Sequence, residues 1–253
     1  MKIIKAFIVA FSMYSRIPMP KFNWESEDMK YHLIFFPWVG VVIGGLEYLL
    51  YFFCEKHQIP SLVMALLAIA IPLVVTGGFH LDGFMDMEDA MSSWQTREKR
   101  LEILKDPHIG AFSVINVITV GILFLAMVLL MSKEAFTIWC FSFFVSRALS
   151  GICVVRCKKA KEDGLLHTEA KTASDKVVFV ALLIQLILVI LFSIYLNPLY
   201  GIFMTIMGIE IAIIDMRKAK RLLGGITGDV MGWFVVNAEV LIAVILGITS
   251  INW

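Results

Sequence analysis

The sequence predicts an all-α integral membrane protein with about seven transmembrane helices. Hydrophobic residues make up 59% of the 253 residues and charged residues only 17%, with a mean hydropathy of +0.84, whereas soluble proteins average roughly 45–50% apolar and about 25% charged residues. The apolar residues form stretches close to the ~20 residues that cross a bilayer. Lys and Arg are concentrated in alternate connections, which gives the chain a predicted orientation.

Seven stretches qualify as membrane spans, and together they make one transmembrane domain over residues 1–253. The sixth stretch is the shortest. Residues 1–32 precede the first span, and we expect them to form an interfacial segment, because the mostly apolar helix near Lys5 is stopped by Pro18 and Pro20. The predicted spans are Leu33–Phe53, Ser61–Phe79, Ile109–Met131, Ala135–Val155, Val177–Leu196, Leu199–Ile214 and Val230–Ser250.

The basic residues predict a cytoplasmic N-terminus and an external C-terminus. Nineteen Lys and Arg residues lie in the N-terminal segment and in the connections after spans two, four and six, against Lys56 and Lys133 on the other side. Cytoplasmic loops carry this excess, so residues 80–108, 156–176 and 215–229 are predicted to be cytoplasmic. The net charge of +1 averages over this asymmetry and gives no indication of nucleic-acid binding.

The main polar feature is the segment 77–90, which places four carboxylates in eight residues directly after an uncharged run, 61–76. Asp82, Asp86 and Asp89 have spacings of four and three residues, so on a helix they fall within about 60° of one face. Mg²⁺ binds oxygen ligands, and water molecules and substrate phosphates usually complete its coordination shell. We therefore expect these three residues to bind Mg²⁺; the alternative is a helix start at which Asp82 is a cap.

Other charged residues admit two interpretations each. Glu102 and Asp106 belong either to a solvated helix or to the site. Arg147 lies inside the fourth span, where it either extends toward the cytoplasmic surface or binds phosphate through its planar guanidinium.

A glycine-rich turn precedes the last span and is predicted to face the same side as the acidic segment. Gly224, Gly225 and Thr227 allow close approach of an anion to the backbone, and the following helix start offers free N–H groups. Asp229 either binds metal or caps the helix. Taken alone this turn is a weak signal, but it fits as the second half of one site.

These motifs make the chain similar to the cobalamin-5'-phosphate synthase family, the membrane adenosylcobinamide-GDP ribazoletransferases, over nearly its whole length. The Gly77–Gly83 string, Gly-Gly-Phe-His-Leu-Asp-Gly, is the most specific match. Ala90 and Ile226 depart from the family pattern, which usually has Gly and Gln there, but neither removes a charged ligand. The other matching segments are Ser15–Pro18, Phe36–Gly40, Asp86 with Asp89, Leu101–Asp106, Ile109–Gly110, Ser146–Arg147 and Leu223–Asp229.

The resemblance implies that adenosylcobinamide-GDP is joined to α-ribazole or its 5'-phosphate, with release of GMP, in the last assembly step of cobalamin biosynthesis. It implies a multi-pass enzyme of the cell membrane with its active site toward the cytoplasm. Asp82, Asp86 and Asp89 would hold one or two Mg²⁺, while Arg147 and the 224–229 turn would bind phosphate oxygens. Asp89 or His80 would accept the proton of the attacking hydroxyl.

Two other functions compete with this interpretation, and a homo-oligomeric state is left open. A CDP-alcohol phosphotransferase also uses clustered Asp residues on membrane helices, but its pattern requires Ala-Arg where this chain has Asp86-Met87, and Gly where it has Thr96. A cation-coupled transporter would account for Glu47 and Arg147 inside spans. Against it, the charges gather on one face, and broken helices near the bilayer midplane are not apparent in the sequence.

Overall fold

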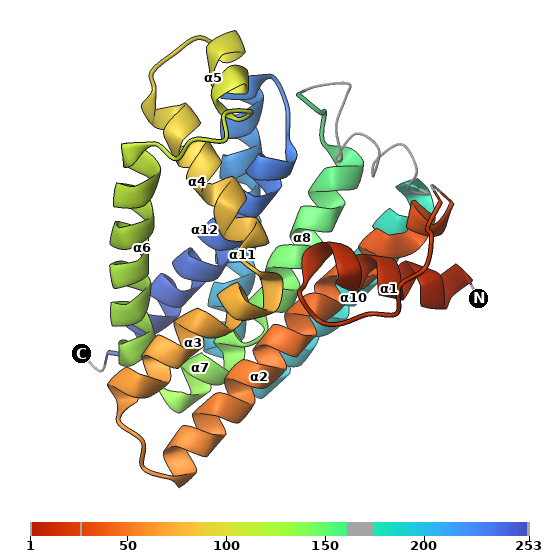
Figure 1. Ribbon diagram of the computed structural model, residues 1–253. Helices are drawn as coiled ribbons and strands as arrows, with labels where there is room; N and C mark the ends of the chain where they lie inside the picture. Colours follow the sequence, from red (N-terminus) through yellow and green to blue (C-terminus); the bar gives the residue numbers. More distant parts are fainter. Residues whose placement is uncertain (1, 26, 161–174, 252–253) are drawn as a thin grey trace.

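The computed structural model describes residues 2–25, 27–160 and 175–251, and this part of the chain is almost entirely helical (Figure 1). Residues 161–174, which are most of the predicted loop 156–176, lie outside the described residues. The helices are α1 (Lys2–Tyr14), the 3-10 helix η1 (Asp28–Phe35), α2 (Phe36–Lys56), α3 (Ser61–Thr76), α4 (Phe79–Ser92), α5 (Arg97–Ile103), α6 (Ala111–Leu130), α7 (Lys133–Trp139), α8 (Ser142–Arg156), α10 (Asp175–Leu196), α11 (Pro198–Leu223) and α12 (Gly228–Thr249).

The predicted spans agree closely with the helices. Six helical segments of the described chain are long and apolar enough to cross a membrane, and there are seven if α3 and α4 together count as one bent span. The fourth span consists of α7 and α8 in succession. Helix α11 continues to Leu223, so the first part of the predicted loop 215–229 is helical.

The structure differs from the sequence-based expectation at Gly77 and Gly78. Both residues have left-handed backbone conformations, with φ of 67° and 81°, which glycine adopts without steric cost. The chain turns by 96° there, from α3 into α4. The first part of the predicted loop 80–108 is therefore a helix, packed against α6 and α12, and the chain contains a broken helix that the sequence did not reveal.

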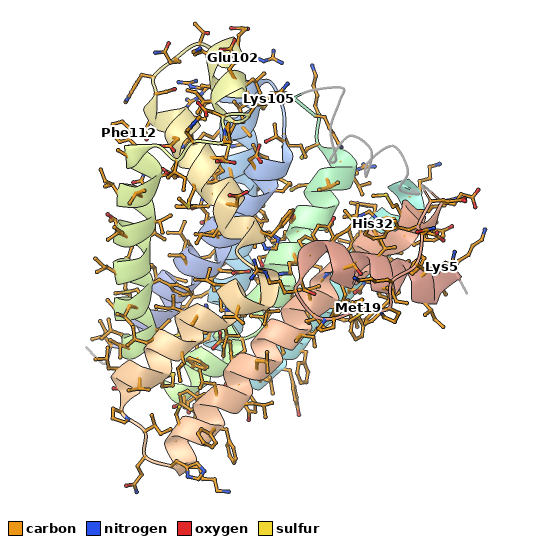
Figure 2. All side chains as sticks on the ribbon, in the orientation of Figure 1. Lys5, Met19, His32, Glu102, Lys105 and Phe112 are labelled. Carbon is orange, nitrogen blue, oxygen red and sulfur yellow. The ribbon has the colours of Figure 1, made fainter. Side chains whose placement is uncertain are left out.

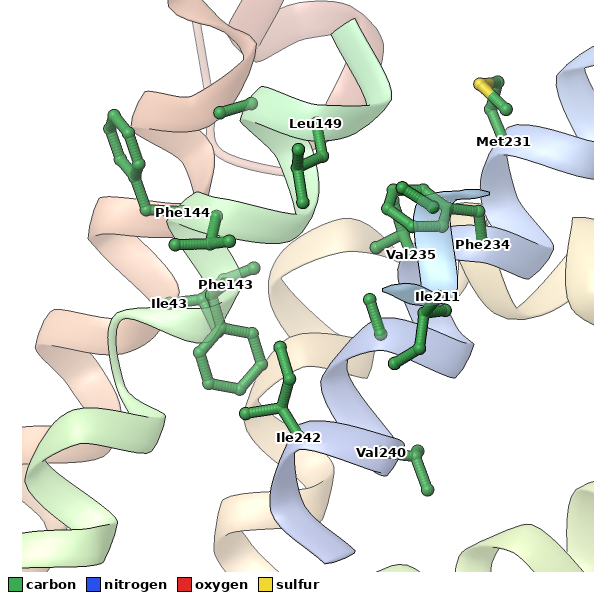
Figure 3. Packing of buried hydrophobic residues seen from close by; sticks show 14 of the residues in the cluster. Ile43, Phe143, Phe144, Leu149, Ile211, Met231, Phe234, Val235, Val240 and Ile242 are labelled. Atoms are coloured by element: carbon green, nitrogen blue, oxygen red, sulfur yellow. The ribbon is translucent and has the colours of Figure 1, made fainter. Parts of the chain in front are cut away.

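The core is built around α8 and α12, which pack against α2 and α11, and Figure 3 shows buried residues of these four helices. Phe143 on α8 and Phe234 on α12 are fully buried. By contrast, α6 and α10 expose large aliphatic side chains such as Ile122 and Leu188, at 65% and 61% of their surface. An apolar exterior of this kind is typical of helices that face lipid.

Helix α1 runs roughly across the direction of α6 and α8 and packs against η1 (Figure 1). Lys5 of α1 forms an ion pair of 3.0 Å with Asp28 of η1. This arrangement agrees with an interfacial N-terminal segment. Helix α5, which contains Glu102 and is followed by Lys105, lies at one end of the bundle (Figure 2), near the turn between α11 and α12.

Candidate active site

The site is organised by a close crossing of α4 and α12, at which glycine on each helix removes the side chain that would separate them. A Cβ placed on Gly83 would lie 2.9 Å from the Cα of Asp229, and one on Gly232 would lie 2.9 Å from the carbonyl oxygen of His80. Only glycine permits such an approach. The crossing brings Asp229 beside the acidic face of α4, as expected if the two motifs form one site.

Four carboxylates, those of Asp82, Asp86, Asp89 and Asp229, lie at this crossing and its rim. Asp82 is exposed and Asp86 is half-buried, and Asp82, Asp89 and Asp229 all act electrostatically on Asp86. Like charges this close oppose one another unless a cation lies among them. Oxygen-only donors of this kind suit Mg²⁺. Among the described residues, however, no three acidic, His or Cys side chains are already placed to hold one ion, so the metal site stays a prediction.

Asp89 also caps a neighbouring helix, a role that the sequence did not indicate. Its two carboxylate oxygens accept hydrogen bonds from the backbone N–H groups of Gly110, at 2.8 Å, and Ser113, at 2.9 Å. These groups begin α6, whose own preceding residue provides no side-chain cap. Asp89 therefore caps α6 from a neighbouring helix, although its oxygens retain further lone pairs.

Glu88, the fourth acid of the segment, points away from the other three, as its helical position predicts. Its carboxylate accepts hydrogen bonds of 2.8 Å from Asn116 on α6 and from the indole N–H of Trp233 on α12. Glu88 thus fastens α4 to both neighbours and positions the face that carries the remaining acids.

The glycine-rich turn is held by short contacts that its sequence makes possible. Gly224 ends α11 with φ of 82°, and Thr227 accepts a hydrogen bond from the N–H of Val230 as the cap of α12. Gly225 lies against the backbone of Lys158. The turn is then fixed by backbone hydrogen bonds of 2.9 Å between Ile226 and the 158–160 segment.

Two arginines that the sequence analysis did not assign to the site lie beside these glycines. The guanidinium of Arg97 covers Gly224, where an added Cβ would lie 2.3 Å from its Cζ atom. Arg16 lies similarly against Gly77, with its Nε atom 2.2 Å from such a Cβ. Both side chains belong to exposed residues. They provide cations at the glycine-rich turn and at the start of α4, and the signal that could have found Arg16 was its place in the Ser15–Pro18 motif.

Arg147 follows neither of its two predicted behaviours. It is 1% exposed, and its Nη1 atom forms a 2.6 Å ion pair with Glu239 of α12 and donates to the carbonyl oxygen of Phe143. The guanidinium is therefore engaged inside the bundle and does not extend to the surface. The predicted phosphate contact of Arg147 does not fit this position.

His80 lies on the opposite side of α4 from Asp82. It is 5% exposed and packs against the rings of Phe36 and Phe79. This position does not suit the predicted role of proton acceptor at the acidic face. His80 instead lines a cavity that also contains Arg147 and Glu239.

Glu102 and Asp106 lie on the solvent side of α5 and the following turn (Figure 2 labels Glu102). Glu102 forms a 2.7 Å ion pair with Lys99, and this pairing lowers the pKa of Glu102. Asp106 accepts a hydrogen bond from the backbone of His108, which lowers the pKa of Asp106. These contacts support the solvated-helix interpretation and leave the predicted substrate contact of both residues without support.

Comparison with known proteins decides the family. The family model described as cobalamin-5-phosphate synthase matches residues 6–247. The chain belongs to the cobalamin-5-phosphate synthase family. A relative in this family from Lachnoclostridium phytofermentans, named adenosylcobinamide-GDP ribazoletransferase, is 37% identical over 95% of this chain and 92% of its own length. Relatives of the same name from Clostridium perfringens and Desulfitobacterium hafniense are 35% and 31% identical, covering 96% and 92% of this chain and 98% and 92% of their own lengths. No solved structure matches the chain.

Proposed function

We propose that the chain is an adenosylcobinamide-GDP ribazoletransferase, the enzyme of the last assembly step of cobalamin. It joins adenosylcobinamide-GDP to α-ribazole or its 5'-phosphate and releases GMP. The observation that carries this proposal is the full-length match to the family and to relatives of that name. The apposition of Asp229 and the acidic face of α4 supports it, because diphosphate chemistry commonly requires carboxylates that hold Mg²⁺.

Asp82, Asp86 and Asp229 are the residues that would hold Mg²⁺, with Asp89 contributing through its remaining lone pairs. Their oxygen donors come from two helices that Gly83 and Gly232 bring into contact. Bound Mg²⁺ would neutralise negative charge on the diphosphate and on the departing GMP.

Arg97, Arg16 and the glycine-rich turn would hold the phosphate oxygens. Guanidinium groups form paired hydrogen bonds with phosphate, and both arginines lie at glycines that leave the backbone accessible. In the transfer, a ribazole hydroxyl oxygen forms a bond to the phosphorus that carries the cobinamide arm, and the bond from that phosphorus to GMP breaks. We assign these cations to orienting the diphosphate for in-line displacement.

The enzyme is proposed to lie in the cell membrane with this site toward the cytoplasm. The support is the excess of Lys and Arg in the segments around the site, against Lys56 and Lys133 elsewhere. A Glu102→Cys variant in a cysteine-free background tests the orientation. A membrane-impermeant thiol reagent should label it in inverted vesicles and leave it unlabelled in intact cells, with Lys56→Cys giving the reverse pattern; the opposite result would exclude this orientation.

The activity is tested by measuring GMP release from purified protein in detergent with Mg²⁺ and both substrates. The wild type should release GMP, whereas Asp82→Asn, Asp86→Asn and Asp229→Asn should lose most of their turnover. Glu102→Gln is the matched control, because it also removes one carboxylate charge but lies on the solvated face of α5, and its turnover should match the wild type. Absence of GMP release from well-folded wild type would refute the activity, and normal turnover of the Asp variants would refute the residue assignment.

A further inference from the structure

A partly open cavity of about 170 Å³ lies on the side of α4 opposite its acidic face, between α3, α4, α6, α8 and α12. Its walls are mostly apolar and include Pro72, Phe84, Val120 and Phe124. A few polar groups interrupt them, among which are His80 and the Arg147–Glu239 ion pair. Apolar walls with a small number of convergent polar groups are typical of small-molecule sites.

His80 is left without a hydrogen-bond partner at this cavity. Although it is 5% exposed, neither ring nitrogen has a partner among the described residues, and the same holds for Nε of Arg147. A buried polar group without a partner destabilises the fold, so such groups usually bind water or a ligand. The imidazole is thus a hydrogen-bonding group at the wall of an apolar space.

The cavity adjoins the surface hollow at the acidic residues. Thr76 and Leu81 line both the cavity and an open hollow of about 460 Å³, whose other walls include Gly78, Asp82 and Met85. Both spaces therefore border the break between α3 and α4 and share these two wall residues. A ligand placed there can bury one part below α4 and present another part beside Asp82.

We propose that this cavity binds the dimethylbenzimidazole ring of α-ribazole, with the ribose in the hollow beside Asp82; this inference rests on the proposed function. An apolar cavity of about 150 Å³ admits benzene, so this partly open space of about 170 Å³ can take the six-membered ring of the base, with the imidazole ring toward the hollow. The ring nitrogen that carries no sugar is an acceptor, and His80 can donate an N–H to it. A lipid acyl chain could fill the same volume, but it would leave His80 unpaired.

The inference predicts a preference for apolar bases. A purine riboside such as adenosine would place its exocyclic amine and additional ring nitrogens against apolar side chains, and unpaired buried polar groups weaken binding. The cavity should therefore select benzimidazole ribosides, while the diphosphate substrate is recognised outside it.

Filling the cavity tests the proposal. Gly121 of α6 lines it, and a Cβ added there meets no atom within 4 Å. Gly121→Leu should raise the KM for α-ribazole at least tenfold and leave the KM for adenosylcobinamide-GDP unchanged. Gly45→Leu is the matched control, because Gly45 also has open space at its Cβ but lines a separate cavity on α2, and both constants should equal those of the wild type.

Binding of α-ribazole alone, measured by titration calorimetry in detergent, gives a readout that does not depend on turnover. The wild type and Gly45→Leu should bind, Gly121→Leu and His80→Ala should bind at least tenfold more weakly, and free dimethylbenzimidazole should compete. Unchanged ribazole affinity in a Gly121→Leu protein with wild-type thermal stability would overturn the proposal, as would equal affinity for adenosine. The proposed activity fails separately: it would be refuted if the wild-type protein released no GMP, whether or not it bound α-ribazole.

Discussion

Gly83 on α4 lies directly against the backbone of Asp229 on α12, so that a single added methyl group would come within 2.9 Å of the Asp229 Cα atom and 3.0 Å of its carbonyl oxygen. Residues separated by most of the chain are thereby brought into one acidic site. The contact depends on the absence of a side chain, and it links the packing of the bundle to the position of its proposed metal ligands.

Gly83→Ala is therefore expected to push α4 away from α12. Overpacking of this kind costs about 1–3 kcal/mol, which exceeds the gain of about 1 kcal/mol that Ala has over Gly inside a helix. Thermal unfolding in detergent should show a lower Tm, and GMP release should fall with it. Gly45→Ala, which meets open space, should be neutral or slightly stabilising, and similar behaviour of the two variants would contradict the tight crossing.

Mg²⁺ should stabilise the folded protein even without substrate. An ion that binds only the folded state adds about 2.7 kcal/mol at a concentration 100 times its Kd, and here it also relieves repulsion among Asp82, Asp86 and Asp229. The Tm should rise with Mg²⁺ in the wild type and return on addition of EDTA. Asp82→Asn should lose most of this shift; an equal shift in Asp82→Asn and wild type would show that the ion binds elsewhere.

The Asp89→Asn variant, studied without Mg²⁺, distinguishes the helix-capping role of Asp89 from its proposed role in metal binding. An amide has one acceptor oxygen, whereas the carboxylate of Asp89 accepts one N–H group of α6 on each oxygen, so Asn can satisfy only part of the cap. We expect a loss of about 1–2 kcal/mol of stability in Mg²⁺-free buffer, measured by chemical unfolding. Asp82→Asn, which removes the same charge from an exposed position, should show no such loss there. Equal Mg²⁺-free stabilities of the two variants would contradict the capping role.

The Arg147–Glu239 ion pair should be far more sensitive to single than to double substitution. Removing one partner leaves a buried charge unpaired, at a cost of about 3–5 kcal/mol, whereas replacing both by apolar residues is often neutral. Arg147→Met and Glu239→Met should each lower the Tm strongly, and the double variant should recover most of it. Additive losses in the double variant would indicate that the two side chains act independently.

The sequence by itself determined the class of the protein and the acidic residues that we propose as metal ligands. The apolar stretches predict the six long spanning segments of the described residues, because a bilayer imposes a minimum length on any helix that crosses it. The second predicted span is instead the shorter helix α3, which is followed by the bend into α4. The face shared by Asp82, Asp86 and Asp89 follows from helix geometry alone, and the divergence of Glu88 follows from the same rule. These are local properties, since they depend on residues within a few turns of one another.

Only the tertiary structure decided which of these residues act together. Four features could not be read from the local sequence pattern. They are the 96° turn at Gly77–Gly78, the contact between Gly83 and Asp229, the capping of α6 by Asp89 and the pairing of Arg147 with Glu239. A glycine in a helix indicates that another backbone can approach closely, and a charged residue inside a span indicates that it needs a partner. Neither indicates which helix provides the contact. That choice is made by the packing of the whole bundle, which places Glu239 beside the buried charge of Arg147 and Asp89 beside the uncapped start of α6.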